Sequence, residues 1–268
     1  MAETKALSPH LGVQVLGAEN LLDEGVIAQC LEALKWRGVL LIRGANLDDD
    51  QQLEFSRRIG EVVSHKDQSI FTISLDPTVN PLAEILKGTF NWHLDGTYDK
   101  TPQKATTLTA KVIAMTGGQT EFASTYAAYE NLPADKKERI DNLRVVHTFE
   151  AAQKGVIDNP TDKQLAAWRR LPPNEISLVW QRRDGRRSLV LGSTADHIPG
   201  LAADESRELL NELLDWSTQE RFRYTHEWEE GDLVVWDNTG LLHRALPYDE
   251  SSRRTLHRTT MHGDESFT

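Results

Sequence analysis

A histidine and a carboxylate two residues apart, with a second histidine far downstream, are residue types that could hold a metal ion. His93 and Asp95 lie in the stretch Asn91–Tyr98, whose β-prone setting predicts both side chains on one face of a strand. His243 follows an apolar strand that ends at Asn238. Two histidines and one carboxylate on one face of a metal leave open positions for a co-substrate and O2, as in non-heme Fe(II) oxygenases. The residue types and spacing are therefore compatible with a metal site.

Each of these residues also has a simpler interpretation. His93 is also explained as an ordinary core or surface histidine, and Asp95 as a turn residue before Gly96. His243 could simply end a strand. Because a lone His-x-Asp is weak evidence for a metal site, the interpretation depends on what the rest of the chain supplies.

Length, cysteine usage and charge restrict the class of protein. A chain of 268 residues is long enough to bury a substantial core as one domain, and the single Cys30 excludes an intramolecular disulfide framework. No apolar signal segment follows residues 1–5 and no run is long enough to span a membrane, so we expect a soluble cytoplasmic protein. The net charge of −11 argues against a nucleic-acid surface. An anionic small substrate stays compatible, since a few basic residues can dominate a pocket.

The first half of the chain mixes strand and helix patterns. Apolar residues at helical spacing predict a helix over 22–36, and Asp48 caps a second helix that ends at Gly60. A third helix is expected over 126–142, with a break at 132–135. Strands are predicted over 9–19, 38–44, 69–94 and 105–114, and a tight turn over 116–119.

The second half is predicted to be mainly β-structure around one helix. Residues 146–173 are polar and contain two proline turns, so we expect irregular structure there, with a mobile lid over about 146–175 as one interpretation. A hairpin over 179–191 should turn at Asp184-Gly185, with its arginines on a solvated rim. The remaining elements are a helix over 201–217 and strands over 222–226, 232–236 and 254–261.

These elements predict a mostly β fold with flanking helices. A curled pair of sheets of the jelly-roll type, the double-stranded β-helix of cupin-like proteins, fits many strands with helices clustered early. A parallel α/β fold would alternate strand and helix throughout, and this chain does not. No repeat or linker divides the chain, so residues 1–268 are expected to form one domain.

Several segments together resemble the taurine dioxygenase family of Fe(II)- and 2-oxoglutarate-dependent oxygenases. The resemblance includes the N-terminal segments 38–44 and 56–60 and is weakest over 146–200. The segments that carry it most specifically are Trp92-His-Leu-Asp-Gly96, Gly117-Gly-Gln-Thr-Glu-Phe-Ala-Ser124, Gly231-Asp-Leu-Val-Val-Trp-Asp-Asn238 through His243-Arg-Ala245, and Arg254-Thr-Leu-His-Arg258.

The resemblance implies a role for six residues. His93, Asp95 and His243 correspond to the iron ligands, Thr120 and Arg254 to the residues that bind the far carboxylate of 2-oxoglutarate, and Arg258 to a second active-site arginine. A guanidinium suits this carboxylate because it offers a permanently charged, bidentate fork. The alternatives to a ligand-binding role are a β-turn hydroxyl for Thr120 and exposed surface charges for the two arginines.

The spacing of the arginines is compatible with these roles. Arg254 lies eleven residues after His243, enough for the chain to leave one strand, turn and return along its neighbour. Arg254 and Arg258 share a face if the stretch is extended, while Arg253 points away. The occurrence of all these residues together, in the order and spacing of the family, is much less probable by chance than the occurrence of any one of them.

The implied reaction couples oxidative decarboxylation of 2-oxoglutarate, with Fe(II) and O2, to hydroxylation of a substrate C–H bond. Asp95 argues for oxygenation over halogenation, since related halogenases lack this carboxylate. Hydroxylation next to a heteroatom often leads to cleavage in this family. The expected substrate is a small organic acid such as a sulfonate, a sulfate ester, an aryloxyalkanoate or an amino-acid derivative. Four residues are predicted to line its pocket, namely His65, Lys87, Phe90 and Tyr98.

Two functions from other classes remain open at this point. A jelly-roll hydrolase or isomerase could use the same three metal ligands without 2-oxoglutarate. Such an enzyme would have no need of Arg254 and Thr120 to bind a dicarboxylate. A non-catalytic binding protein on the same scaffold would have no chemical reason to keep three metal ligands. Exposed loops and a sheet edge are compatible with a homodimer or homotetramer.

Overall fold

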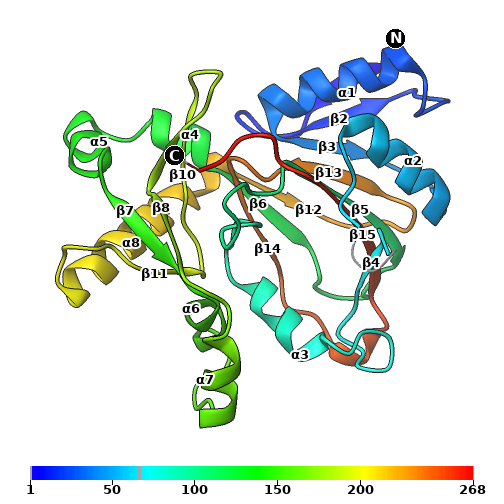
Figure 1. The fold of residues 1–268 in the computed structure, drawn as a ribbon. Helices are drawn as coiled ribbons and strands as arrows, with labels where there is room; N and C mark the ends of the chain where they lie inside the picture. Colours follow the sequence, from blue (N-terminus) through cyan, green and yellow to red (C-terminus); the bar gives the residue numbers. More distant parts are fainter. Residues whose placement is uncertain (1, 65–67, 268) are drawn as a thin grey trace.

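The computed structural model describes residues 2–64 and 68–267, and two of its sheets face each other (Figure 1). The larger sheet has the order β1 (Glu3–Ala6), β2 (Val13–Leu16), β3 (Val39–Ile42), β13 (Leu233–Asp237), β5 (Ala105–Val112), β15 (Thr255–Met261), β4 (Phe71–Ile73). The smaller sheet has the order β12 (Arg223–His226), β6 (Thr120–Ser124), β14 (Leu241–Ala245). The predicted jelly-roll fold with flanking helices is confirmed.

Apolar side chains fill the space between the sheets and the outer face of the larger sheet. Between the sheets, Phe122 of β6 meets Val234 and Trp236 of β13 in one buried cluster. On the outer face, α1 (Glu24–Arg37) and α2 (Asp49–Ile59) pack through Cys30 and Phe55. Burial of these faces on both sides fixes the register of the larger sheet.

The path from β14 to β15 differs from the prediction. The eleven-residue spacing predicted that Arg254 returns along the neighbour of the strand carrying His243. Instead, β14 pairs with β6 in the smaller sheet, whereas β15 pairs with β5 and β4 in the larger one. The chain crosses through η3 (Glu250–Ser252) and turns at Arg253, which has a positive φ of 54°. Arg254 therefore approaches His243 from the opposite sheet.

The predicted strand over 69–94 is wrong beyond Ile73. The chain there forms α3 (Ala83–Leu86) and the 3-10 helix η1 (Lys87–Phe90). Asn80 favours this outcome because its side chain accepts the Leu82 N–H at 2.9 Å. Such a local hydrogen bond competes with a strand ladder.

The segment 146–173 is more regular than predicted. It contains α6 (Phe149–Lys154) and α7 (Asp162–Trp168), between β7 (Arg144–His147) and β8 (Asn174–Ser177). The side chains of Thr148 and Thr161 cap the two helices, the latter in a capping box with Gln164. These caps are local sequence signals for the two helices, but the polar composition of the segment obscured them. A mobile lid stays a prediction.

The remaining elements form a second layer outside the smaller sheet. The break before α5 and the hairpin turning at Asp184-Gly185 are confirmed. Trp180 and Leu209 pack with Leu242 in the largest buried cluster. The elements are α4 (Thr125–Glu130), α5 (Ala134–Ile140), β9 (Val179–Gln181), β10 (Arg187–Leu189), β11 (Ala195–His197), α8 (Ala203–Ser217) and η2 (Glu220–Phe222).

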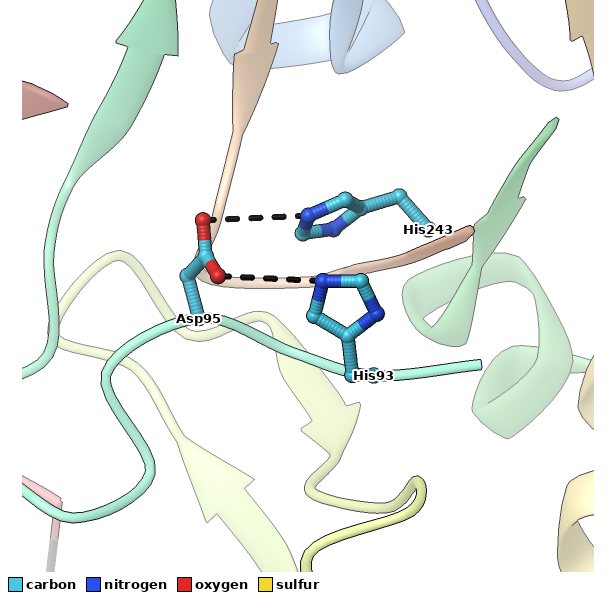
Figure 2. A group of neighbouring side chains, drawn as sticks. All are labelled: His93, Asp95 and His243. Carbon is cyan, nitrogen blue, oxygen red and sulfur yellow. Dashed lines mark ion pairs between the residues drawn. The ribbon is translucent and has the colours of Figure 1, made fainter. Parts of the chain in front are cut away.

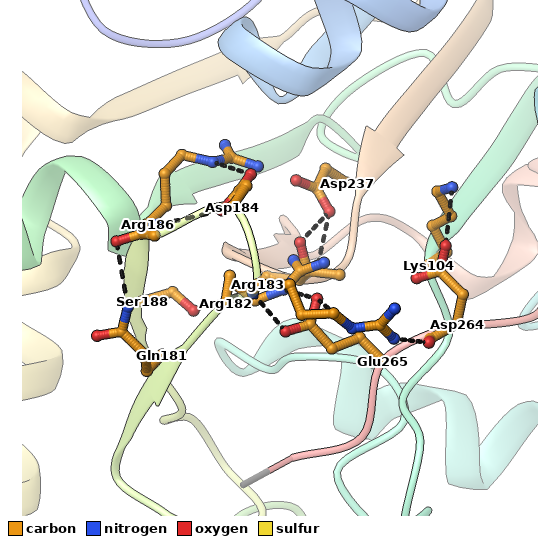
Figure 3. A network of polar contacts seen from close by, with 12 residues as sticks. Lys104, Gln181, Arg182, Arg183, Asp184, Arg186, Ser188, Asp237, Asp264 and Glu265 are labelled. Atoms are coloured by element: carbon orange, nitrogen blue, oxygen red, sulfur yellow. Dashed lines mark hydrogen bonds and ion pairs between the residues drawn. The ribbon is translucent and has the colours of Figure 1, made fainter.

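The C-terminal segment is tied to the hairpin by charged side chains (Figure 3). Glu265 accepts hydrogen bonds from the Arg182 side chain at 3.0 Å and from the Arg183 backbone at 2.7 Å. Lys104 pairs with Asp264 at 3.4 Å. We call these five residues the C-terminal latch. The predicted solvated rim is therefore wrong for Arg182, whose side chain is only 12% exposed. In the part of the chain that the structure describes, every helix is too short or too polar to cross a bilayer.

Candidate metal centre and anion site

Backbone hydrogen bonds hold the two candidate histidines side by side. The His93 N–H donates to the His243 carbonyl at 3.0 Å, and the His243 N–H donates to the His93 carbonyl at 2.9 Å. The ring centroids are 4.2 Å apart. The Asp95 carboxylate turns back toward both rings, with one oxygen 3.9 Å from His93 Nε2 and the other 3.7 Å from His243 Nε2 (Figure 2). We call these three residues the triad.

The triad fits a divalent metal ion. One ligand atom from each residue lies within 4.8 Å of the others. The Nδ1–H of His93 donates to the Asn91 carbonyl at 2.9 Å, which leaves the Nε2 lone pair directed at Asp95. Asp95 Oδ2 is buried without a hydrogen-bond partner. Two imidazoles and one carboxylate suit Fe(II).

The surroundings keep His243 and Asp95 in their metal-binding protonation states. Burial, together with His93, lowers the pKa of the His243 imidazole to about 3, so this ring is neutral at pH 7. Burial acts to raise the pKa of Asp95, but His243, Arg258 and His93 outweigh it and hold that pKa below its usual range. A neutral imidazole and an ionised carboxylate are the forms that bind a metal.

Arg254 lies close to the triad with its charge unmatched. Its side chain is almost fully buried, 3% exposed, and donates to the Gly118 carbonyl at 2.8 Å. Its guanidinium lies 4.7 Å from the Tyr248 ring centroid. Within residues 2–64 and 68–267 no carboxylate pairs with it. Burial lowers its pKa, yet a guanidinium stays protonated in a protein. A buried cation without an anion is costly, so this position is suited to an anionic ligand.

Glycine permits this close approach. Gly118 has φ of +74°, and a Cβ there would lie 2.9 Å from Arg254 Nε. Any side chain at this position would displace the guanidinium and strain the turn. The predicted turn over 116–119 therefore sets the position of the arginine as well as of Thr120.

Thr120 and Arg258 complete the polar wall. Thr120 lies on β6 and is 5% exposed. Arg258 lies on β15 with its guanidinium 5.0 Å from the Phe71 ring centroid, and its Nε is buried without a partner. Arg258 lines the same cavity as His93 and His243, and its charge lowers the pKa of Asp95.

One narrow cavity of about 60 Å³ is lined by the two histidines of the triad, Thr120 and both arginines. Arg254 and Arg258 both face it, as their four-residue separation predicted. Its polar lining includes His93, Thr120, His243, Arg254 and Arg258, and its apolar lining includes Ile73, Leu108, Trp236 and Leu256.

Three of the four predicted substrate residues lie outside the lining of this cavity. Lys87 pairs with Glu84 at 3.1 Å and with Glu250 at 2.8 Å. Phe90 packs edge-on against Tyr248. Tyr98 packs against Phe149 at 6.1 Å between centroids. None of the three lines the described part of the cavity, and His65 lies outside the described residues.

Three residues that contact the site were not predicted from the sequence. Tyr248 contacts Arg254, Phe71 contacts Arg258, and Trp228 donates to Thr120. The first two are single aromatic residues in a loop and a short strand, without a motif that would mark them. Trp228 follows β12 at alternate spacing from Tyr224 and His226, a pattern that places the three on one face.

Comparison with known proteins agrees with this geometry. Residues 3–260 match the family described as "Taurine catabolism dioxygenase TauD, TfdA family". The chain is 33% identical to an alpha-ketoglutarate-dependent 2,4-dichlorophenoxyacetate dioxygenase of Cupriavidus pinatubonensis, over 93% of each chain. It is 28% identical to an alpha-ketoglutarate-dependent sulfate ester dioxygenase of Pseudomonas putida, over 95% of this chain and 87% of that one.

Solved structures show the same fold over the full length. The structure of AAD-2 in complex with Mn(II) and N-oxalylglycine superposes with a TM-score of 0.86 and 29% identity, covering 100% of both chains. Alpha-ketoglutarate is 2-oxoglutarate, so the relatives share the co-substrate that the resemblance implied, and a hydrolase, isomerase or binding protein is not favoured. The chain belongs to the TauD, TfdA family of Fe(II)- and 2-oxoglutarate-dependent dioxygenases.

Proposed function

We propose that this dioxygenase oxidises a C–H bond next to a heteroatom in a small organic acid, with an aryloxyalkanoate as the first substrate to test. Relatives named for 2,4-dichlorophenoxyacetate and (S)-phenoxypropionate support this class, at 33% and 32% identity. Hydroxylation of the carbon that bears the aryl ether oxygen would release the phenol. The observation that carries the proposal is the buried, unpaired Arg254 in the cavity of the triad.

The residues divide the site into a metal end and an anion end. His93, Asp95 and His243 hold Fe(II). Arg254 and Thr120 bind the far carboxylate of 2-oxoglutarate, because both face the cavity and no carboxylate among the described residues pairs with Arg254. When bound, the iron and 2-oxoglutarate supply the oxidising power by reaction with O2.

Arg258 is suited to the anionic groups nearest the metal. Its guanidinium is close enough to Asp95 to lower the pKa of that carboxyl, and its buried Nε has no partner in the described chain. We assign it to the metal-binding carboxylate of 2-oxoglutarate and to the acid group of the substrate. Ile73 and Leu108 provide apolar wall for the substrate and exclude water.

The test begins with an anaerobic titration of the purified apoprotein with Fe(II) and then 2-oxoglutarate. A visible metal-to-ligand charge-transfer band should form. The band should be absent in Asp95→Ala. In Arg254→Ala it should require a higher concentration of 2-oxoglutarate. Failure of well-folded protein to form the band would overturn the proposed cofactor roles.

Substrate identity is tested by turnover in air. Phenoxyacetate, an alkyl sulfate and taurine are compared for stimulated succinate formation, with phenol, sulfate or sulfite measured as the matching product. We expect phenoxyacetate to give succinate and phenol in equal amounts. Stimulation by the alkyl sulfate or taurine but not by phenoxyacetate would contradict the aryloxyalkanoate assignment while leaving the reaction type intact.

A further inference from the structure

Thr120 is hydrogen-bonded from behind by a tryptophan that does not line the cavity. The indole Nε1–H of Trp228 donates to Thr120 Oγ1 at 3.0 Å, and both residues are buried. Thr120 faces the cavity of the triad, whereas Trp228 is absent from its described lining. The indole therefore acts on any ligand only through the threonine.

This hydrogen bond sets the direction in which Thr120 can donate. A hydroxyl has one hydrogen and two lone pairs, and an indole N–H is a donor only. Because Trp228 occupies a lone pair, the Thr120 hydrogen must go to another acceptor. No acceptor for it is found among the described residues. The free hydrogen is therefore available to an anion in the cavity.

The same bond selects the side-chain rotamer. Rotation of a threonine about χ1 exchanges the positions of its hydroxyl and methyl groups, and only the hydroxyl can accept from Trp228. The indole thus disfavours the rotamers that would present a methyl group to the ligand. The backbone of Thr120 is held independently, since β6 pairs with β12 on one side and β14 on the other.

Trp228 is itself held in place by a buried polar chain. Its ring packs edge-on against His226, with centroids 4.4 Å apart. The two nitrogens of His226 face the Tyr224 hydroxyl at 3.2 Å and the Asp232 carboxylate at 3.2 Å. Asp232 is fully buried and is also paired with Arg43. The position of the indole is thereby linked to the larger sheet, where Arg43 follows β3.

We propose that Trp228 is a positioning residue that presents the Thr120 hydroxyl to the far carboxylate of 2-oxoglutarate. This inference rests on the proposed function, because it takes Thr120 and Arg254 as the binders of that carboxylate. Trp228 supports binding of the co-substrate and does not contact the reacting atoms. Its loss should therefore raise the KM for 2-oxoglutarate much more than it lowers kcat.

The test is a calorimetric titration of Mn(II)-loaded protein with N-oxalylglycine. Trp228→Phe keeps an aromatic ring but removes the N–H, and should weaken binding about fivefold, the effect of roughly one hydrogen bond. Thr120→Val removes the hydroxyl and should weaken it about tenfold or more. In the Thr120→Val background, Trp228→Phe should have no further effect.

Two controls separate positioning from general destabilisation. Trp216→Phe removes an indole hydrogen bond of similar length, 2.9 Å to the Ala128 carbonyl, far from the cavity. It should leave N-oxalylglycine binding unchanged. N-methyloxamate keeps the metal-chelating head and lacks the far carboxylate, so its affinity should be the same in wild type and Trp228→Phe.

The outcomes distinguish this inference from the proposed function. Failure of the wild type to bind N-oxalylglycine would overturn the proposed function itself. Normal binding by Trp228→Phe, or an equal loss for N-methyloxamate, would overturn only the role of Trp228.

If Trp228→Phe does not fold, an NMR spectrum of the wild type tests the same proposal. In zinc-loaded protein labelled with 15N-tryptophan, N-oxalylglycine should move one indole N–H signal. The signal it moves should be the one that Thr120→Val displaces in the ligand-free protein. If the two changes affect different signals, the proposal fails.

Discussion

The cavity of the triad and the C-terminal latch each contain a largely buried arginine, but among the described residues only the arginine of the latch is paired with a carboxylate. Arg182 meets Glu265 at 3.0 Å and also donates to the Tyr126 hydroxyl at 2.9 Å. Arg254 is more deeply buried and donates to the Gly118 carbonyl, and within the described residues no carboxylate pairs with it. Arg258 likewise leaves its Nε without a partner.

This difference separates structural charges from functional ones. Removing one partner of a complete buried ion pair destabilises the fold, whereas a buried charge without a partner is a cost that a bound ligand can offset. Substitutions in the cavity should therefore change ligand binding and spare stability. Substitutions in the latch should do the reverse.

Asp95→Ala should have the largest effect. Without this ligand the two histidines alone hold the metal, and turnover should fall by about 10³-fold or more. Succinate formation under saturating Fe(II) is the measurement. Asp49→Ala is a matched control, because Asp49 binds His257 at 2.7 Å outside the cavity and its loss should leave turnover nearly unchanged. Retention of turnover by Asp95→Ala would show that the triad is not the metal site.

Arg254→Met should have the second-largest effect. Removal of the guanidinium should raise the KM for 2-oxoglutarate by about 100-fold, the effect of losing one partner of a buried charge pair. The free energy of unfolding of the apoprotein should change by less than about 1 kcal/mol, because the lost charge was unpaired. Urea denaturation and the KM are measured together. A large loss of stability with a normal KM would make Arg254 a structural residue like Arg182.

Glu265→Gln should show the opposite pattern. It removes the charge that Arg182 and Arg183 share, and we expect about 2 kcal/mol of lost stability, in the range for a hydrogen bond to a charged group. The KM for 2-oxoglutarate should stay at the wild-type value. Asp264→Asn is the control, since that side chain is 66% exposed and its pair with Lys104 should contribute little. A raised KM in Glu265→Gln would mean that the latch is coupled to the cavity.

Lys87→Met should have the smallest effect. The ammonium is already paired with Glu84 and Glu250, so we expect the substrate KM to change by less than about threefold and stability by about 0.5 kcal/mol. A KM that rises tenfold would instead support the sequence-based prediction that Lys87 binds the substrate anion. Steady-state kinetics with the substrate found in the turnover screen decide between them.

The sequence indicated the triad and Arg254 because the short segments that carry these residues resemble those of the taurine dioxygenase family. The His-x-Asp pair, the glycine turn before Thr120 and the four-residue separation of the two arginines are all local patterns. Such patterns can be recognised in a sequence before its fold is known. The helices within 146–173 were also encoded locally, in the caps Thr148 and Thr161, but the polar composition concealed them.

What the sequence by itself determined was therefore the set of side chains able to hold a metal and an anion, together with the jelly-roll class of the fold. Only the tertiary structure decided how charges far apart in the chain are matched. It placed Arg254 opposite His243 by carrying the chain from one sheet to the other, and it paired Lys87 with Glu250. It also brought Trp228 behind Thr120, 108 positions away. The physical reason is that matching a buried charge or hydroxyl depends on distances across the core, and those distances arise only when the two sheets pack together.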